Sequence, residues 1–164
     1  MNTSPLKKFA VATLLAGTFF TASAALKVGD TLPDLASFSL EGKLPDALKG
    51  KIVIVDFWAS WCLPCAKSFP VLDELQKKYG DKVIVLAVNV DEKKSKMDNF
   101  LAKHPVTFTV VRDAEQKLVA VAEPATMPTS FILDGEGKVR FLHNGFHGED
   151  TRKEYVSEIE SLLK

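Results

Sequence analysis

The sequence predicts an α/β protein with a central mixed β-sheet that is flanked by helices. Two nearly continuous apolar, β-branched runs, residues 52–58 and 83–90, are each followed by residues at helical spacing, which is typical of parallel strands joined by crossover helices. A turn signal at 134–137 lies between two later strand patterns and indicates an antiparallel hairpin. The chain has 164 residues, 46% of them hydrophobic, which suits one globular domain.

The first half of the predicted domain contains two buried strands and a helix between them. Residues 26–50 mix glycine, proline and short apolar pieces, and we expect an irregular lead-in there. The run at 52–58 reads IVIVDFW, as expected for a strand that is buried on both faces. Apolar residues recur at helical spacing over 69–79, and Gly80 then supplies a stop signal. The second buried strand follows at 83–90.

Helices and strands continue to alternate in the second half. A helical pattern at 97–104 ends before Pro105, because the residue before a proline avoids helical angles. A short strand is predicted at 106–111. Asp113 and Gln116 resemble a capping pair, and we expect them to open another short helix.

The last part of the chain predicts a hairpin and one more helix. Strands at 130–133 and 138–143 surround the turn sequence DGEG at 134–137. Thr151 and Glu154 then form a capping box at the start of the final helix. Parallel crossovers that are followed by a hairpin and a last helix make one α/β domain.

Composition and charge exclude several classes of protein. Lys and Arg number 21 and so do Asp and Glu, which gives a formal net charge of zero. Nucleic acid is therefore not an expected partner, because proteins that bind it usually have a basic face. The sequence is not predicted to be disordered, because disorder requires low hydrophobicity with high net charge. It is not a disulfide-stapled scaffold, because such a scaffold requires more than two cysteines. We expect a compact, soluble monomer.

Residues 1–24 have the layout of a secretory signal peptide. Lys7-Lys8 form a basic region, residues 9–20 form an apolar one, and small residues at 22–24 suit a signal peptidase. Cleavage would leave residues 25–164 as a mature domain, exported to the periplasm and soluble there. The alternative is an uncleaved N-terminal anchor, but the apolar run is shorter than the ~20 residues that a membrane span needs.

Cys62-Leu63-Pro64-Cys65 lies where the first strand runs into the first long helix. A thiol at a helix start faces unpaired N–H groups and the positive end of the helix dipole, which stabilise a thiolate. Cys62 is therefore the predicted attacking sulfur, and Cys65, one turn later, can resolve a mixed disulfide. In an oxidising compartment the pair is either a tight disulfide or a working dithiol.

Two other interpretations of the cysteine pair are a zinc site and an inert structural disulfide. His143 and His147 have a spacing that occurs among zinc ligands, but they lie far along the chain from the cysteines, so no metal site is predicted. A structural disulfide stabilises by closing a long loop, and a gap of two residues closes almost nothing. We therefore predict that the cysteine pair is redox-active.

The segment DFWASWCLPC at 56–65, together with Pro70 and Met127-Pro128-Thr129, resembles the thioredoxin superfamily. The predicted export signal, the lead-in at 33–50 and the phrase MPTSFILD at 127–134 resemble its exported TlpA/ResA-like branch. The resemblance covers nearly all of the chain after residue 24 and implies a thioredoxin-like fold.

The resemblance implies roles for residues beside the cysteines. Pro128 matches a cis-proline that lies against the active-site disulfide, where the backbone of Met127 would pair with an extended substrate segment. The alternative is a trans-proline at a strand start. Trp61 would shape the docking surface, and Leu63 and Pro64 would contact the substrate and tune the redox pair.

Two acidic residues have implied roles in proton transfer. Asp56 matches the buried acid of thioredoxin that accepts the proton of Cys65, and burial without a partner raises a carboxyl pKa into a range useful for a general base. Many TlpA/ResA-like proteins have a neutral residue there, so Asp56 is a departure toward thioredoxin. Glu92 resembles an acidic residue near the active site of ResA-like proteins, and the alternative is a solvated charged loop with Lys93 and Lys94.

The implied function is that of an exported thiol–disulfide oxidoreductase, and more narrowly of a reductase of disulfides in exported partner proteins, including those of cytochrome c maturation. A membrane thiol donor would reduce the pair again, because a reductant in an oxidising space cannot draw directly on the cytosolic pool. No cofactor is expected, since the dithiol carries the electrons and no glycine-rich phosphate loop is present. The alternatives are an antioxidant peroxidase of peroxiredoxin type and a metal-delivery protein that uses the dithiol with His143 or His147.

Overall fold

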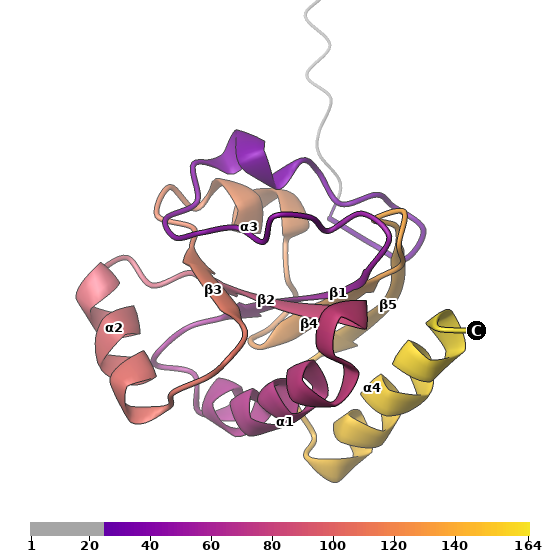
Figure 1. Cartoon of the computed structure of the whole chain (residues 1–164). Helices are drawn as coiled ribbons and strands as arrows, with labels where there is room; N and C mark the ends of the chain where they lie inside the picture. The colour runs from indigo at the N-terminus through magenta and orange to yellow at the C-terminus, as the bar shows by residue number, and fades with distance from the viewer. Residues whose placement is uncertain (1–24) are drawn as a thin grey trace, which may run out of the picture.

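The computed structural model describes residues 25–164, whose strands form one mixed sheet (Figure 1). The strands are β1 (Ile52–Trp58), β2 (Val83–Asn89), β3 (Thr109–Arg112), β4 (Thr129–Leu133) and β5 (Val139–Asn144). They lie in the order β3-β2-β1-β4-β5. β2 is parallel to β1 and to β3, while β4 is antiparallel to β1 and to β5. The predicted α/β fold with a mixed sheet is confirmed.

Helices cover both faces of the sheet. They are α1 (Leu63–Tyr79), α2 (Lys94–Lys103), α3 (Lys117–Ala122) and α4 (Glu149–Leu162). Figure 1 shows α1 and α4 on one face, and α3 on the other together with the segment that precedes β1. That segment is irregular apart from a short 3-10 helix at Leu35–Phe38, in line with the predicted lead-in.

The central strand β1 is buried along its whole length, because both of its faces are covered. Its even-numbered apolar side chains join the core cluster that contains both cysteines and residues of α1, α2 and α4. Its odd-numbered side chains join the core beneath α3 and the lead-in. Successive side chains of a strand point to opposite faces, so Asp56 points toward the layer that holds the cysteines.

The first long helix begins at the cysteine motif and ends where the sequence predicts. α1 continues through Pro70 and is followed by Gly80, whose φ of 55° suits glycine and whose N–H donates to the carbonyl of Gln76. Phe69 and Leu72 are buried on its inner side against the sheet. The helix therefore holds the motif rigidly over β1.

The elements β3 and α4 do not begin where the sequence predicts. β3 begins at Thr109, later than the predicted start at residue 106. α4 begins at Glu149, ahead of the predicted capping box, so Thr151 lies inside the first turn. The hydroxyl of Thr151 accepts a hydrogen bond from the N–H of His147, at 2.9 Å, and so bonds to the turn before the helix. The predicted capping box was wrong for this reason.

The short helix α3 also begins later than the predicted capping pair suggests. Asp113 accepts hydrogen bonds from the N–H groups of Lys117 and Val119, at 3.1 and 2.8 Å, and so caps the helix from a distance. Gln116 has a positive φ of 56° and its side chain donates to the carbonyl of Val90 instead. Asp113 therefore caps the helix as predicted, whereas the predicted capping role of Gln116 was wrong.

No helix within residues 25–164 is long and apolar enough to cross a membrane. The predicted signal peptide, residues 1–24, lies outside the described residues.

Candidate active site

Cys62 and Cys65 form a disulfide at the N-terminus of α1, with their Cα atoms 5.3 Å apart. Cys62 is the residue that caps the helix, and its sulfur accepts a hydrogen bond from the N–H of Cys65 at 3.2 Å. Cys62 retains 5% exposure, while Cys65 has none. A partner sulfur can therefore approach Cys62 first, and Cys65 is shielded behind it.

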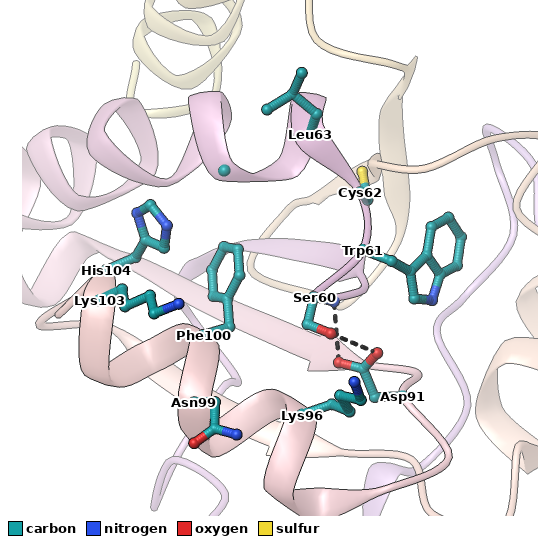
Figure 2. A pocket seen from close by; sticks show the side chains of 11 residues that line it. Ser60, Trp61, Cys62, Leu63, Asp91, Lys96, Asn99, Phe100, Lys103 and His104 are labelled. Carbon is teal, nitrogen blue, oxygen red and sulfur yellow. Dashed lines mark hydrogen bonds between the residues drawn. The ribbon is translucent and has the colours of Figure 1, made fainter.

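Two large apolar side chains flank the accessible cysteine. Trp61 is 72% exposed and Leu63 is 69% exposed, although both are large hydrophobic residues. Figure 2 shows Trp61 and Leu63 on either side of Cys62, each pointing away from the protein core. Pro64 is also exposed and occupies the first turn of α1. Exposed apolar surface beside a reactive sulfur is suited to hold a partner chain.

A pocket of about 640 Å³ lies beside Cys62, between the start of α1 and the helix α2 (Figure 2). Lys96 and Lys103 line it, are exposed, and form no ion pair with any residue of 25–164. The acidic residue of the pocket, Asp91, is buried and accepts hydrogen bonds from the N–H and hydroxyl of Ser60, both at 3.0 Å. The pocket wall thus presents free positive charge to an approaching partner.

Pro128 is buried at the start of β4, and the Met127–Pro128 peptide bond is cis, as the resemblance implies. Its carbonyl accepts a hydrogen bond from the N–H of Gly145 at 2.8 Å, which ties the proline to the end of β5. Met127 is half-buried and packs against both core clusters. Neither residue lines the pocket beside α2.

Asp56 is completely buried in the middle of β1. Its Oδ1 accepts a hydrogen bond from the hydroxyl of Ser130 at 2.5 Å, while its Oδ2 has no partner within residues 25–164. The hydroxyl of Tyr155 donates in turn to Ser130 Oγ at 2.8 Å. Burial raises the pKa of Asp56 to about 7, against the lowering effect of the Ser130 hydrogen bond. The carboxyl can therefore gain and lose a proton near neutral pH.

The sequence pattern singled out Asp56 and missed Ser130, which is bonded to it, and Tyr155, which is bonded to Ser130. Ser130 is the one polar residue inside the apolar run SFIL of β4, which was a weak signal of an inward hydroxyl. Tyr155 lies on the buried side of α4 and gave no signal beyond an ordinary apolar position.

Glu92 lies just after β2 and is exposed. It lines a second pocket, of about 490 Å³, together with Trp61. Its carbonyl and that of Asp91 accept hydrogen bonds from the same guanidinium nitrogen of Arg112, at 2.9 and 3.1 Å. Arg112 also makes two hydrogen bonds to the carboxylate of Glu41 in the lead-in. The sequence analysis missed Arg112, which fixes the loop beside the cysteine motif.

His143, one of the two histidines considered for a zinc site, has other partners. His143 Nε2 lies 2.7 Å from Glu158 Oε2, and its Nδ1 lies 3.4 Å from Glu154 Oε2. Its ring packs edge-on against Tyr155, with ring centroids 4.8 Å apart. Across residues 25–164, no group of three or more His, Cys, Asp and Glu side chains is arranged to hold a metal ion.

The profile of the Redoxin family matches residues 27–163 of the chain. The thiol-disulfide oxidoreductase ResA of Geobacillus thermodenitrificans (strain NG80-2) is 34% identical over 145 residues, which is 86% of this chain and 83% of the relative. The protein of the same name from Bacillus anthracis is 37% identical over 150 residues, or 89% of this chain and 82% of the relative.

The fold is also similar to solved structures. A crystal structure of a candidate thiol:disulfide interchange protein DsbE from Chlorobium tepidum superposes with a TM-score of 0.77. It is 38% identical in sequence, and the match covers 85% of this chain and all of that one. Relatives and structures agree on the chemistry that the cysteine pair of this chain can perform.

Proposed function

The chain belongs to the Redoxin family and is a thiol–disulfide oxidoreductase of the TlpA/ResA-like branch of the thioredoxin superfamily, and from this premise we propose that it reduces disulfides of partner proteins outside the cytoplasm. One observation carries the proposal. Cys62 is partly accessible, Cys65 is shielded behind it, and the buried carboxyl of Asp56 lies on the same side of the sheet as both cysteines.

In the first step the thiolate of Cys62 attacks one sulfur of the partner disulfide. A bond forms between Cys62 and that sulfur, the partner's S–S bond breaks, and the other partner sulfur leaves as a thiolate that takes up a proton. The position of Cys62 at the N-cap of α1 supports this role, because helix N–H groups and the helix dipole stabilise negative charge on its sulfur.

In the second step Cys65 resolves the mixed disulfide. Its thiol gives up a proton to Asp56, its sulfur bonds to Cys62, and the second partner sulfur leaves. The partner has then gained two electrons and the cysteine pair has lost two. A carboxyl whose pKa is raised to about 7 is suited to accept this proton near neutral pH.

The proposed location and partners rest on the sequence. The layout of residues 1–24 supports export, and the exported partner proteins carry disulfides that this protein reduces. A membrane protein with a thiol pair restores the dithiol by the reverse exchange. Disulfides within the CxxCH motif, where haem is attached in c-type cytochromes, are the substrates that would place the protein in cytochrome c maturation.

The proposal is tested by trapping the intermediate in protein that lacks residues 1–24. Cys65→Ser should accumulate a mixed disulfide through Cys62 with an oxidised CxxCH peptide, while Cys62→Ser should form none. Wild-type protein should release the peptide fully reduced. If Cys65→Ser captures nothing and wild-type protein leaves the peptide oxidised, the proposed reductase function is wrong.

The direction of electron flow is decided by the reduction potential of the pair against glutathione. A value near or below about −230 mV supports a reductant, and a value near about −120 mV would mark an oxidant that inserts disulfides. The second result would leave the oxidoreductase chemistry in place and reverse the proposed direction.

A further inference from the structure

Three residues from distant parts of the chain form a buried line of hydrogen bonds. Asp56 on β1 lies directly opposite Ser130 in the antiparallel register of β1 and β4. Ser130 Oγ donates to Asp56 Oδ1 at 2.5 Å, and the Tyr155 hydroxyl from α4 donates to Ser130 Oγ at 2.8 Å. All three residues have at most 1% exposure. Water therefore does not compete for these bonds in the folded protein.

The hydrogen bonds of this line run in one direction, from Tyr155 to Ser130 and from Ser130 to Oδ1 of Asp56. An ionised carboxylate can only accept, so the single hydroxyl hydrogen of Ser130 is directed at Oδ1. Ser130 Oγ is then left with lone pairs, to which Tyr155 donates. One lone pair of Oδ1 therefore already accepts the serine hydrogen, whereas Oδ2 has no partner within residues 25–164 and is open on both.

The titratable groups around the far end of the line lie on α4 and β5. Burial raises the pKa of Tyr155, and the negative charge of Asp56 adds to that effect, followed by Glu158 and Glu154. His143 on β5 packs edge-on against the tyrosine ring, and its Nε2 lies 2.7 Å from Glu158 Oε2. Tyr155 therefore keeps its proton across the working pH range and serves as a permanent donor.

We propose that Ser130 and Tyr155 are positioning residues for the resolving step: Ser130, held by the tyrosine hydroxyl, binds Oδ1 of Asp56 and leaves Oδ2 as the atom that accepts the proton of Cys65. The inference rests on the proposed reductase function. The Cys65 S–H bond breaks as the Oδ2–H bond forms, the Cys65 sulfur bonds to Cys62, and the partner's sulfur leaves with the electron pair of the broken S–S bond. The proton returns to Cys65 when the thiol donor reduces the pair.

The serine hydroxyl also affects the acidity of the carboxyl, and the tyrosine can act on it only through the serine. The Ser130 hydrogen bond lowers the pKa of Asp56 against the raising effect of burial. A hydrogen bond to a charged group that is lost on substitution corresponds to about one to two pH units. Ser130→Ala should therefore raise the pH midpoint of the resolving step by about one to two units. Tyr155→Phe, which only weakens the serine as a donor, should raise the midpoint by about half a unit.

The experiment follows the mixed disulfide with a cyclic CxxCH peptide between about pH 5 and 10, with acid quenching and mass spectrometry. Ser130→Ala should resolve about tenfold more slowly than wild type at about pH 7 and within about twofold of it at about pH 10. Ser130→Thr keeps a hydroxyl and should restore the wild-type midpoint. Tyr79→Phe is the matched control, because the hydroxyl of this tyrosine donates to the exposed Glu160 and takes no part in the buried line.

A midpoint that stays at the wild-type pH in Ser130→Ala and in Tyr155→Phe would overturn the inference, as would a rate that falls equally at every pH. Titration of the ¹³C-labelled Asp56 carboxyl in reduced protein measures the same shift without turnover. If Ser130→Ala does not fold, Tyr155→Phe decides the question in both measurements. Wild-type protein that releases no reduced peptide would refute the proposed function itself, whereas an active wild type with unmoved midpoints refutes only the role of the hydroxyl residues.

Discussion

Replacement of Asp56 by asparagine should make the oxidised protein more stable at alkaline pH. The carboxyl is completely buried and accepts one hydrogen bond within residues 25–164, from Ser130, so burial costs its ionised form most of its solvation. The introduced amide would be neutral at every pH and nearly the same size as the carboxyl, and its carbonyl oxygen can accept the serine hydrogen bond. The variant therefore removes the charge and leaves the packing in place.

The magnitude follows from the raised pKa of Asp56. Its carboxyl titrates at about 7 in the folded protein, against an ordinary value of 3.8 in the unfolded chain. Below pH 3.8 both states are protonated, and between the two values the folded state holds a proton that the unfolded state has lost. The free energy of unfolding of wild type therefore falls by up to about 1.4 kcal/mol per pH unit between pH 3.8 and about 7. Above pH 7 this contribution no longer changes, and the total loss is about 4 kcal/mol.

The assay is urea unfolding of the oxidised proteins at each pH from about 3.5 to 9, followed by the fluorescence of the buried Trp58. We expect Asp56→Asn to match wild type within about 1 kcal/mol at about pH 3.5 and to exceed it by about 2 to 4 kcal/mol at about pH 8.5. Asp73→Asn is a control of opposite sign, because the folded protein lowers the pKa of Asp73 and so gains stability from its ionised form above pH 3.8. The reasoning is refuted if Asp56→Asn keeps the wild-type slope between about pH 4 and 7.

Three further outcomes are expected. Phe69→Ala should destabilise the protein by about 3 to 5 kcal/mol in urea unfolding, because the ring is buried edge-on against three other aromatic rings, and a loss below about 1 kcal/mol would contradict this. Arg112→Ala should cost about 2 to 4 kcal/mol in the same assay, since four hydrogen bonds are lost. Glu41→Gln should cost much less, because the carboxylate is partly exposed, and equal losses in the two variants would show that the carbonyl bonds do not matter. Trp61→Ala should change the free energy of unfolding by less than about 0.5 kcal/mol but should slow the reduction of a protein disulfide. Reduction of a small-molecule disulfide, and the exposed Val28→Ala variant, are the controls. Equal slowing with the protein and the small-molecule disulfide would contradict a docking role for Trp61.

The fold was predictable where local pattern and tertiary position agree. The run at 52–58 is continuous because helices cover both faces of β1, and the structure gives the strand these same bounds. The start of α1 was predictable from the cysteine motif with Pro64, and its end from Gly80. The start of α4 was not, because the hydroxyl of Thr151 bonds to the preceding turn and not to the helix. Such a choice depends on where the turn lies in space.

The residues of the site were likewise predictable only where a local pattern marks them. Cys62 and Cys65 were identified from four adjacent letters, and their roles follow from a helix start that is itself local. Arg112 was missed because its partners are a carboxylate in the lead-in and two carbonyls after β2, and none of these is marked by a spacing. A side chain whose function is to join three segments has no signature in any one of them.

The surroundings of Asp56 were unpredictable because they depend on strand register. β1 and β4 are far apart in the chain, so no tight turn fixes how they pair, and the structure places Ser130 opposite Asp56. A slip of one residue would turn the serine hydroxyl to the other face of the sheet, and a slip of two would put Ile132 or Pro128 opposite the acid. β4 begins directly after Pro128, so the strand that holds Ser130 opposite the buried carboxyl adjoins the cis-proline where, by the resemblance to thioredoxin, a substrate segment would pair. Any change that shifts this strand along β1 should therefore alter substrate binding and the pH dependence of resolution together.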